Sequence, residues 1–250
     1  MHLLIRVTLV FTSAALTGCA GIQSQSAVNS AENVKAVAPE NAPPTVAKAF
    51  PQAVVFAYRV MPTKKAGEFD TDGGSTAIVL APSVIQTARH AIHSPLNRPL
   101  SLYLIRRQTT GTVLGSAEKS EQNGDWVLLQ LDKPVWGRDE HVGGLSFENL
   151  PIRKGEPVFL LGYLIEGSDN IVPAIVKGAA DSDFATDEPV KATIDSRLRL
   201  DGMSGGALAV ERNGGLVVVG SLRQAADPAD PRQPFVICSR LPKGALQAAK

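Results

Sequence analysis

The segment RLDGMSGGALAVERNGGLVVVGSL, residues 199–222, contains a glycine-rich turn followed by two apolar runs. The runs ALAVE and LVVVGSL are short and rich in β-branched residues, which is typical of strands. Asn213 and Gly214 lie between the runs and are typical of a turn. The segment therefore predicts two neighbouring strands. It leaves open whether Ser204 is a nucleophile on a tight turn or an ordinary loop residue.

Runs of the same kind follow one another along the chain from about residue 50. The others are AVVFAYRV, GSTAIVLA, LSLYLIRR, GTVLGSA, DWVLLQL, EPVFLLGYLI, IVPAIVKGAA, VKATID and FVICSRL. No long segment with a helical period intervenes, so a parallel sheet with crossover helices is disfavoured. About a dozen short strands indicate a barrel or a sandwich, most naturally two packed barrels. The final PKGALQAAK is the best candidate for a helix.

The composition of the 250 residues is that of an ordinary globular protein. Hydrophobic residues make up 44% of the chain, aromatic residues 5%, and the formal net charge is +1. Basic and acidic residues are scattered along the sequence, which gives no electrostatic footprint of a nucleic-acid-binding protein. We therefore expect no nucleic-acid partner.

The N-terminus has the pattern of an export signal. MHLLIRVTLVFTSAALTGC contains one Arg, then an apolar stretch too short to span a membrane comfortably, then small residues. Its end, LTGC, resembles the bacterial lipobox, which implies a signal peptide over residues 1–18 and a lipid anchor on Cys19. The residue after the lipobox Cys, Ala20, is not Asp. In a bacterium with two membranes, this resemblance implies sorting to the outer membrane, on its periplasmic face. Residues 19–48, rich in small and polar types, are predicted to form a flexible tether.

The cysteine content agrees with this interpretation. Cys19 and Cys238 are the only cysteines, so a lipidated Cys19 leaves Cys238 without a disulfide partner in the chain. Cys238 lies in the apolar run PFVICSRL and is predicted to be a small buried hydrophobic residue rather than a nucleophile.

The order of the histidines and Ser204 discriminates between three serine-hydrolase architectures. His90, His93 and His141 all precede Ser204, which excludes the order Ser, acid, His of α/β-hydrolases, although GMSGG matches their G-x-S-x-G pattern. The subtilisin order Asp, His, Ser belongs to an α/β fold, which the strand pattern contradicts. The order His, Asp, Ser on an all-β scaffold remains.

Three segments in that order resemble segments of bacterial trypsin-like serine proteases. TARH resembles the segment that carries the catalytic His, GDWVLLQLDKPV the segment around the orienting Asp, and DGMSGGALAV the nucleophile loop. The resemblance covers about residues 50–246. It implies an all-β, chymotrypsin-like domain over 49–250, with two packed six-stranded antiparallel barrels, at about 49–140 and 150–241, and a short C-terminal helix.

The resemblance also implies roles for individual residues. His90 would act as general base toward Ser204, the nucleophile, and Asp125 would hold the imidazole. The backbone N–H groups of Gly202 and Ser204 would form an oxyanion hole. The implied substrate is a polypeptide, and we expect no cofactor.

Each of these residues has a plainer interpretation as well. G-x-S-G-G is common in loops, and an Asp before an apolar strand is usually a turn residue. His90 and His93 in HAIH could form half of a metal site, but the sequence has no HExxH and no cysteine pair, so we expect no metal. His141 lies in the polar stretch GRDEHVGG and is predicted to be a surface loop residue.

The sequence departs from the family pattern in two places. Met203 stands where zymogen-activated members have an Asp that pairs with a newly freed N-terminus. Because methionine cannot form this ion pair, we expect the fold to be competent for activity without proteolytic activation. By the resemblance, the substrate pocket has Leu198 at its base and Ser221, Leu222 and Arg223 on its wall. The apolar base argues against a preference for Lys or Arg. Arg223 would either favour an acidic residue or block the pocket.

Together these patterns predict a lipid-anchored serine endopeptidase of the bacterial envelope. The alternative is a catalytically inert lipoprotein with the same fold that acts as a binding or scaffolding protein. Esterase activity would use the same acyl-transfer chemistry and is not separable by sequence.

Overall fold

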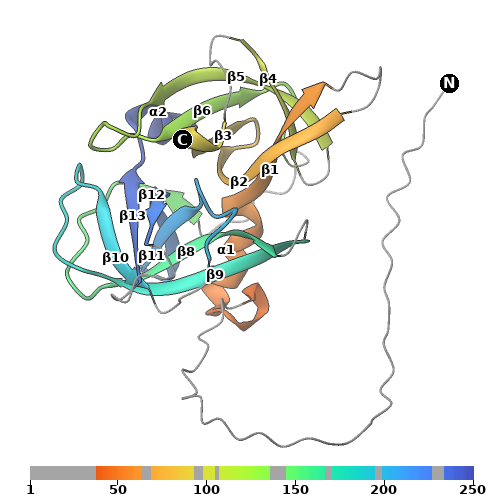
Figure 1. The fold of residues 1–250 in the computed structure, drawn as a ribbon. Coiled ribbons are helices and arrows are strands. Elements are labelled where there is room, and N and C mark those ends of the chain that lie inside the picture. Colours follow the sequence, from red (N-terminus) through yellow and green to blue (C-terminus); the bar gives the residue numbers. More distant parts are fainter. Residues whose placement is uncertain are drawn as a thin grey trace, which may run out of the picture. The chain divides into compact units, whose positions relative to one another are not determined.

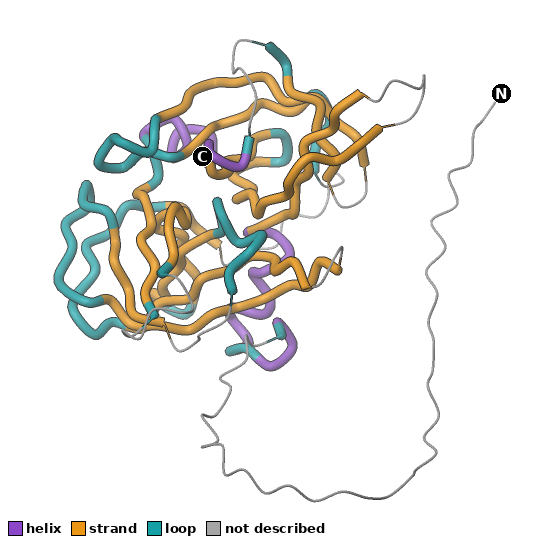
Figure 2. The backbone as a smooth tube through the Cα atoms, in the orientation of Figure 1, coloured by secondary structure: helices purple, strands orange, loops and turns teal. Residues whose placement is uncertain are grey.

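The computed structural model describes residues 38–62, 69–92, 98–104, 107–135, 145–166, 170–194, 199–226 and 234–250. Strands dominate, and Figures 1 and 2 show them in two groups, one built from each half of the chain. Several predicted features lie outside the described residues: the signal peptide over 1–18, Cys19, His93, His141 and Leu198. None of the helices in the described ranges has the length and apolar character needed to cross a membrane.

The first group of strands is a closed barrel. Its strands are β1 (Val54–Pro62), β2 (Phe69–Ala81), β3 (Val84–Ala88), β4 (Leu100–Leu104), β5 (Arg107–Ala117) and β6 (Trp126–Leu131). They pair in the antiparallel order β1-β2-β3-β6-β5-β4, and β4 closes onto β1. In β4, LSLYL alternates strictly between buried and exposed side chains, as expected for a strand with one face in the core and one in solvent.

The second group is also a closed ring of strands. It contains β8 (Pro157–Glu166), β9 (Asn170–Ala180), β10 (Val190–Ile194), β11 (Ala207–Arg212), β12 (Gly215–Ala225) and β13 (Phe235–Arg240). The antiparallel order is β11-β8-β9-β10-β13-β12, and a β11–β12 pairing closes the ring. The short β7 (Leu145–Phe147) precedes this barrel in the chain and pairs in parallel with residues 216–218 of β12.

The predicted fold class is therefore confirmed. Each barrel closes with six antiparallel strands, and a short helix, α2 (Lys243–Ala248), lies near the C-terminus. Buried apolar side chains of alternating strand positions fill each barrel: Ile85, Leu102 and Leu129 belong to the core of the first, and Leu160 and Leu208 to that of the second.

The structure corrects the end of the predicted tether. A single 3-10 turn, η1 (Pro39–Asn41), and a helix, α1 (Pro44–Ala53), occupy its last residues. In α1, Val46, Ala49, Phe50 and Ala53 are buried, and their spacing places them on one helical face. This face packs into the protein, so these residues belong to the folded domain and not to a linker.

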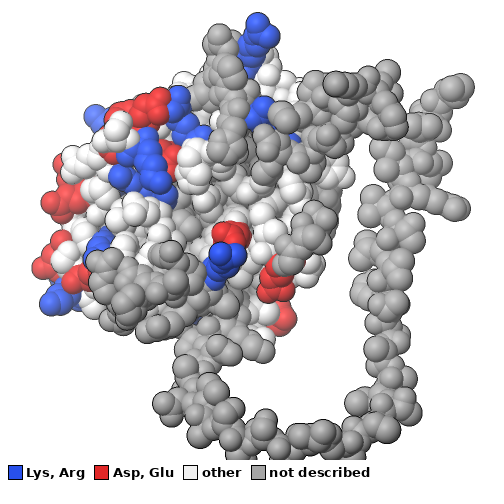
Figure 3. Space-filling view, viewed as in Figure 1, with Lys and Arg blue, Asp and Glu red and all other residues white. Residues whose placement is uncertain are grey.

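A third apolar cluster joins α1, α2 and both barrels. It includes Ile78 of β2, Leu161 of β8, Leu216 of β12 and Leu241, together with the buried face of α1. This shared core holds the two barrels against each other, which matters because the candidate site takes residues from both. On the face shown in Figure 3, basic and acidic side chains are interspersed, in keeping with the net charge of +1.

Candidate active site

The first barrel presents His90 directly after a buried strand. Every residue of β3 is buried, and the chain leaves its end in a single 3-10 turn, η2 (Arg89–Ala91). This turn carries His90 to the surface, where 39% of its side chain is exposed. An imidazole held on a rigid strand end and open to solvent can exchange protons with a bound group.

Asp125 ends the loop that leads into β6, and its backbone conformation is unusual. Its φ of 68° lies in the left-handed region, which Asp tolerates better than most residues. Hydrogen bonds fix this conformation: the N–H of Asp125 donates to the carbonyl of Ala117 (3.1 Å), and the N–H of Arg89 donates to the carbonyl of Asp125 (3.2 Å). The carboxylate is thereby directed inward, with 1% of the side chain exposed.

Two hydrogen bonds join Asp125 to His90. Oδ1 accepts from the backbone N–H of His90 at 3.0 Å, and Oδ2 lies 2.6 Å from the imidazole Nδ1. A buried carboxylate at this distance favours the tautomer that carries its proton on Nδ1. Nε2 is then the ring nitrogen that can accept a proton.

The second barrel supplies Ser204 opposite that nitrogen. Its Oγ lies 3.0 Å from Nε2 of His90, a residue 114 positions earlier in the chain. The structure thus brings His90, Asp125 and Ser204 into one line of hydrogen bonds. The roles predicted for them depend on this arrangement.

Two glycines shape the turn around Ser204. Gly202 has φ 90° and Gly205 has φ 79°, conformations that side chains with a Cβ rarely adopt. A Cβ on Gly205 would also lie 2.5 Å from the carbonyl oxygen of Thr76 and 2.6 Å from the nitrogen of Ala88. The close approach of the second-barrel turn to β2 and β3 therefore requires glycine at this position.

Thr76 of β2 links the two barrels at the same turn. Its N–H and its Oγ1–H both donate to the carbonyl of Gly202 at 2.8 Å, and its Oγ1 accepts from the N–H of Tyr163 at 2.9 Å. Within the described residues, the N–H groups of Gly202 and Ser204 donate no hydrogen bond to the protein. The predicted oxyanion hole therefore stays a prediction.

Met203 supports this turn from inside the second barrel. Its side chain is fully buried in the barrel core, and a Cβ on Gly162 would lie 3.0 Å from its Cε. Its N–H donates to Leu200 and its carbonyl accepts from Gly206, at 3.0 and 2.8 Å. The turn is thus held by apolar packing and local hydrogen bonds at the position where zymogen-activated proteases have an ion pair.

A cavity of about 540 Å³ opens beside Ser204. It is lined by Arg199, Leu200, Asp201, Gly202, Ser204, Leu222, Gln224, Ala225 and Ala226. Leu222 lies in the lining as predicted. Arg199, Asp201 and Gln224 were not predicted, although they flank the predicted positions in the sequence. All three are polar residues in the lining of the cavity that contains Ser204.

Two of the predicted pocket residues lie elsewhere. Ser221 is buried, and its Oγ accepts a hydrogen bond from Nε2 of Gln86 at 3.0 Å. The guanidinium of Arg223 donates to backbone carbonyls of the loop before Asp125, including that of Gln122 at 2.8 Å. Neither residue lines the cavity beside Ser204. The predicted effect of Arg223 on substrate choice stays a prediction.

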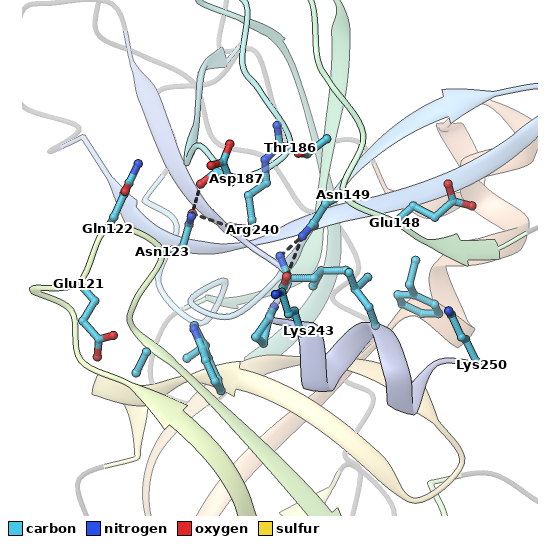
Figure 4. Close-up of a pocket in the computed structure, with 16 residues that line it drawn as sticks. Glu121, Gln122, Asn123, Glu148, Asn149, Thr186, Asp187, Arg240, Lys243 and Lys250 are labelled. Atoms are coloured by element: carbon cyan, nitrogen blue, oxygen red, sulfur yellow. Dashed lines mark hydrogen bonds between the residues drawn. The ribbon is translucent and has the colours of Figure 1, made fainter.

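A larger cavity, of about 820 Å³, lies between α2, β13 and the loop before β6, and no member of the His90–Asp125–Ser204 line contributes to it (Figure 4). Arg240 is buried in its wall and donates from Nε and Nη2 to the carbonyls of Glu188 and Ala185, at 2.8 and 2.6 Å. Burial lowers the pKa of this guanidinium. Nearby, Cys238 is fully buried, as predicted, and its burial raises the pKa of its thiol.

No group of three or more His, Cys, Asp or Glu side chains suited to a metal ion occurs in the part of the chain that the structure describes. His93, the second histidine of the predicted half-site, lies outside that part.

No protein-family model matches the sequence, and no curated protein shows significant similarity to it. Solved structures do match. One is the crystal structure of the Rv3671c protease in an inactive form, with a TM-score of 0.51 and 18% identity over 82% of this chain and 90% of that one. Another is an inactive form of a serine-to-alanine mutant of Rv3671c from M. tuberculosis H37Rv, with a TM-score of 0.52 and 17% identity over 87% and 93%. This likeness shows the chymotrypsin-like fold.

Proposed function

We propose that this protein is a serine endopeptidase that uses Ser204 as nucleophile, His90 as general base and Asp125 as the residue that orients the imidazole. The observation that carries the proposal is the continuous hydrogen-bonded line of these side chains, 2.6 Å from Asp125 to His90 and 3.0 Å from His90 to Ser204. A nucleophile needs a base within such a distance, and the base needs a third group to hold it.

The proposed reaction follows from this geometry. Nε2 of His90 takes the proton of Ser204 as Oγ attacks the carbonyl carbon of the peptide bond, and the carboxylate of Asp125 stabilises the imidazolium. The imidazolium then gives its proton to the leaving amine, and the C–N bond breaks to leave an acyl-enzyme. Water, deprotonated by the same nitrogen, cleaves the ester and restores the hydroxyl.

The proposed oxyanion hole consists of the N–H groups of Gly202 and Ser204. Both are unoccupied by protein acceptors in the described part of the chain. Donors of this kind stabilise the negative oxygen of the tetrahedral intermediate, and the loss of one typically costs about 10²–10³ in rate.

A polypeptide is favoured over a small ester by the strand edge beside the cavity. The pairing of β12 with β11 ends at Ser221, while β12 continues to Ala225 along its other partner, β13. Gln224 and Ala225 of this continuing stretch line the cavity next to Ser204. An extended peptide can add to such an edge through main-chain hydrogen bonds.

Labelling with a fluorophosphonate tests the proposed nucleophile. We expect the wild-type protein to form a phosphonyl adduct on Ser204, identified by mass spectrometry, because only an activated serine reacts at a useful rate. The Ser204→Ala variant is the control and should stay unlabelled. Cleavage of a denatured polypeptide into internal fragments then separates an endopeptidase from an esterase. Absence of labelling in the folded wild-type protein would favour the inert binding protein instead.

The proposed location is the bacterial envelope, with lipid on Cys19. The support is the sequence LTGC at the end of an export signal. When the full chain is expressed in a bacterium with radiolabelled palmitate, we expect label on the wild-type protein and recovery in the membrane fraction. Cys19→Ser should lose both the label and the membrane association. A wild-type protein without label would show that Cys19 carries no lipid and that the proposed anchor is wrong.

A further inference from the structure

We propose that Arg223 is a positioning residue for the active site. It holds the loop that ends at Asp125 and ties this loop to the strand that forms a wall of the substrate cavity. This inference rests on the proposed function. It differs from the pocket role that the sequence suggested for the same residue.

In the first half of the loop before Asp125, residues 118–122, an ion pair joins Glu118 to Arg89 of the first barrel. The N–H of Glu121 donates to the carbonyl of Glu118 and that of Gly124 to the carbonyl of Glu121, both at 3.1 Å. Glu118 also donates from its N–H to the carboxylate of Glu121, at 2.7 Å. The side chains of residues 118–122 are exposed, so packing contributes little to the position of this part of the loop.

Arg223 attaches the same half of the loop to the second barrel. Its Nη1 donates to the carbonyls of Glu121 and Gln122, at 3.2 and 2.8 Å, and its Nη2 donates to the carbonyl of Lys119 at 3.3 Å. A planar guanidinium with several N–H groups is suited to holding neighbouring carbonyls in a fixed arrangement. Hydrogen bonds from a charged donor are also stronger than those from a neutral one.

The backbone at Arg223 explains why its side chain reaches this loop. The register of β12 against β13 shifts between Leu222 and Gln224, which makes Arg223 the extra residue of a β-bulge. A bulge turns a side chain away from the direction that regular alternation would give it. Its neighbours Leu222 and Gln224 line the cavity beside Ser204, so one short stretch contacts both the cavity and the Asp125 loop.

The end of the loop near Asp125 has separate anchors on the same barrel. Oγ of Ser239 donates to the carbonyl of Gly124 at 2.6 Å, and the N–H of Arg240 donates to Oδ1 of Asn123 at 3.1 Å. The amide of Asn123 also donates to the carbonyl of Asp187, and in Figure 4 dashed lines join Asn123 to Asp187 and to Arg240. These anchors and the Glu118–Arg89 pair should keep the loop folded when Arg223 is removed, while residues 119–122 lose their hydrogen bonds to Arg223.

The expected consequence is a change in chemistry and not in substrate binding. A shift of a catalytic group by a fraction of an ångström is enough to slow a reaction severalfold or more. We therefore expect Arg223→Ala to lower kcat about tenfold while KM stays within about twofold, because Arg223 does not line the cavity. A residue that bound substrate would instead raise KM.

The experiment compares Arg223→Ala, Arg223→Lys and Arg212→Ala with the wild-type protein. Arg212 is a second-barrel arginine that pairs with Glu156 and does not contact the loop, which makes it the matched control. The readouts are kcat and KM for 4-nitrophenyl acetate, the rate of fluorophosphonate labelling, and the low-field proton resonance of His90 Nδ1–H. We expect Arg223→Ala to slow both reactions and to shift or broaden the resonance. Arg223→Lys should be intermediate, and Arg212→Ala should match the wild type.

The outcomes separate this inference from the proposed function. If the wild-type protein is labelled and active and Arg223→Ala leaves kcat, labelling rate and resonance unchanged, only the positioning role is wrong. A rise in KM alone would overturn it in favour of substrate binding. If the wild-type protein is neither labelled nor active, the proposed function is wrong, and the positioning role that rests on it is wrong as well. If circular dichroism shows that Arg223→Ala does not fold, the same readouts are compared between Arg223→Lys and the wild type. An Arg223→Lys protein with unchanged kcat, labelling rate and resonance would then overturn the positioning role.

Discussion

Replacing Ser204 with alanine is expected to lower kcat for a cleaved peptide by about 10⁶, because the group that forms the acyl-enzyme is removed. In the structure, Oγ of Ser204 forms a hydrogen bond with Nε2 of His90 at 3.0 Å and supports no other element by a hydrogen bond among the described residues. Deleting one oxygen should therefore leave the fold and the cavity unchanged. The measurement is the steady-state rate of peptide hydrolysis, with the melting temperature followed in parallel.

The matched control for this prediction is the pair of variants His90→Ala and His90→Ala with Ser204→Ala. Residues that act as one unit are not additive, so each single variant and the double variant should retain the same small residual rate. A Ser204→Ala protein that keeps more than about a tenth of the wild-type rate would show that another group is the nucleophile.

Asp125→Asn is expected to lower kcat by about 10⁴ with little change in fold. Asn tolerates the left-handed conformation of this position, and its Oδ1 can still accept from the backbone N–H of His90. Its NH₂ group would then face Nδ1, which favours the imidazole tautomer that carries its proton on Nε2. That tautomer cannot take the proton of Ser204, so the base is lost while its position is kept.

Asp132→Asn is the control for this variant. Asp132 lies just beyond the other end of β6 and accepts hydrogen bonds from Oγ1 of Thr109 and the N–H of Thr110, which lower the pKa of its carboxyl. Because it is remote from His90, its replacement should leave kcat and KM unchanged. Equal losses of kcat in both variants would mean that the loss comes from reduced stability and not from the orientation of His90. An Asp125→Asn protein with the full wild-type kcat would show that Asp125 has no part in the mechanism.

The strands and their grouping followed from the sequence because a strand is a local pattern. Residues of β4 alternate between core and solvent, and the apolar runs of β8 and β12 are long enough to be buried on both sides. The helix α1 was missed although Val46, Ala49, Phe50 and Ala53 have helical spacing. The prolines and small polar residues around it resemble a linker, and only the apolar surface of the two barrels gives its buried face a partner.

The walls of the cavity could not be derived in the same way. Ser221, Leu222 and Arg223 are consecutive, and regular alternation would send neighbouring side chains to opposite faces. The bulge at Arg223 interrupts this alternation, and no residue type in this stretch of the sequence predicts a bulge. Arg223 consequently reaches the first barrel, while Gln224 and Ala225 line the cavity.

The strand pattern, the glycines of the turn around Ser204 and the chain order of His90, Asp125 and Ser204 can all be derived from the amino-acid sequence alone. These are properties of neighbouring residues or of simple order along the chain. The folded protein alone shows that Nε2 of His90 lies 3.0 Å from Oγ of Ser204, and that Arg223 donates hydrogen bonds to the Asp125 loop. Those distances join residues about a hundred positions apart. They depend on the packing of two closed barrels against a shared core, which no local pattern encodes.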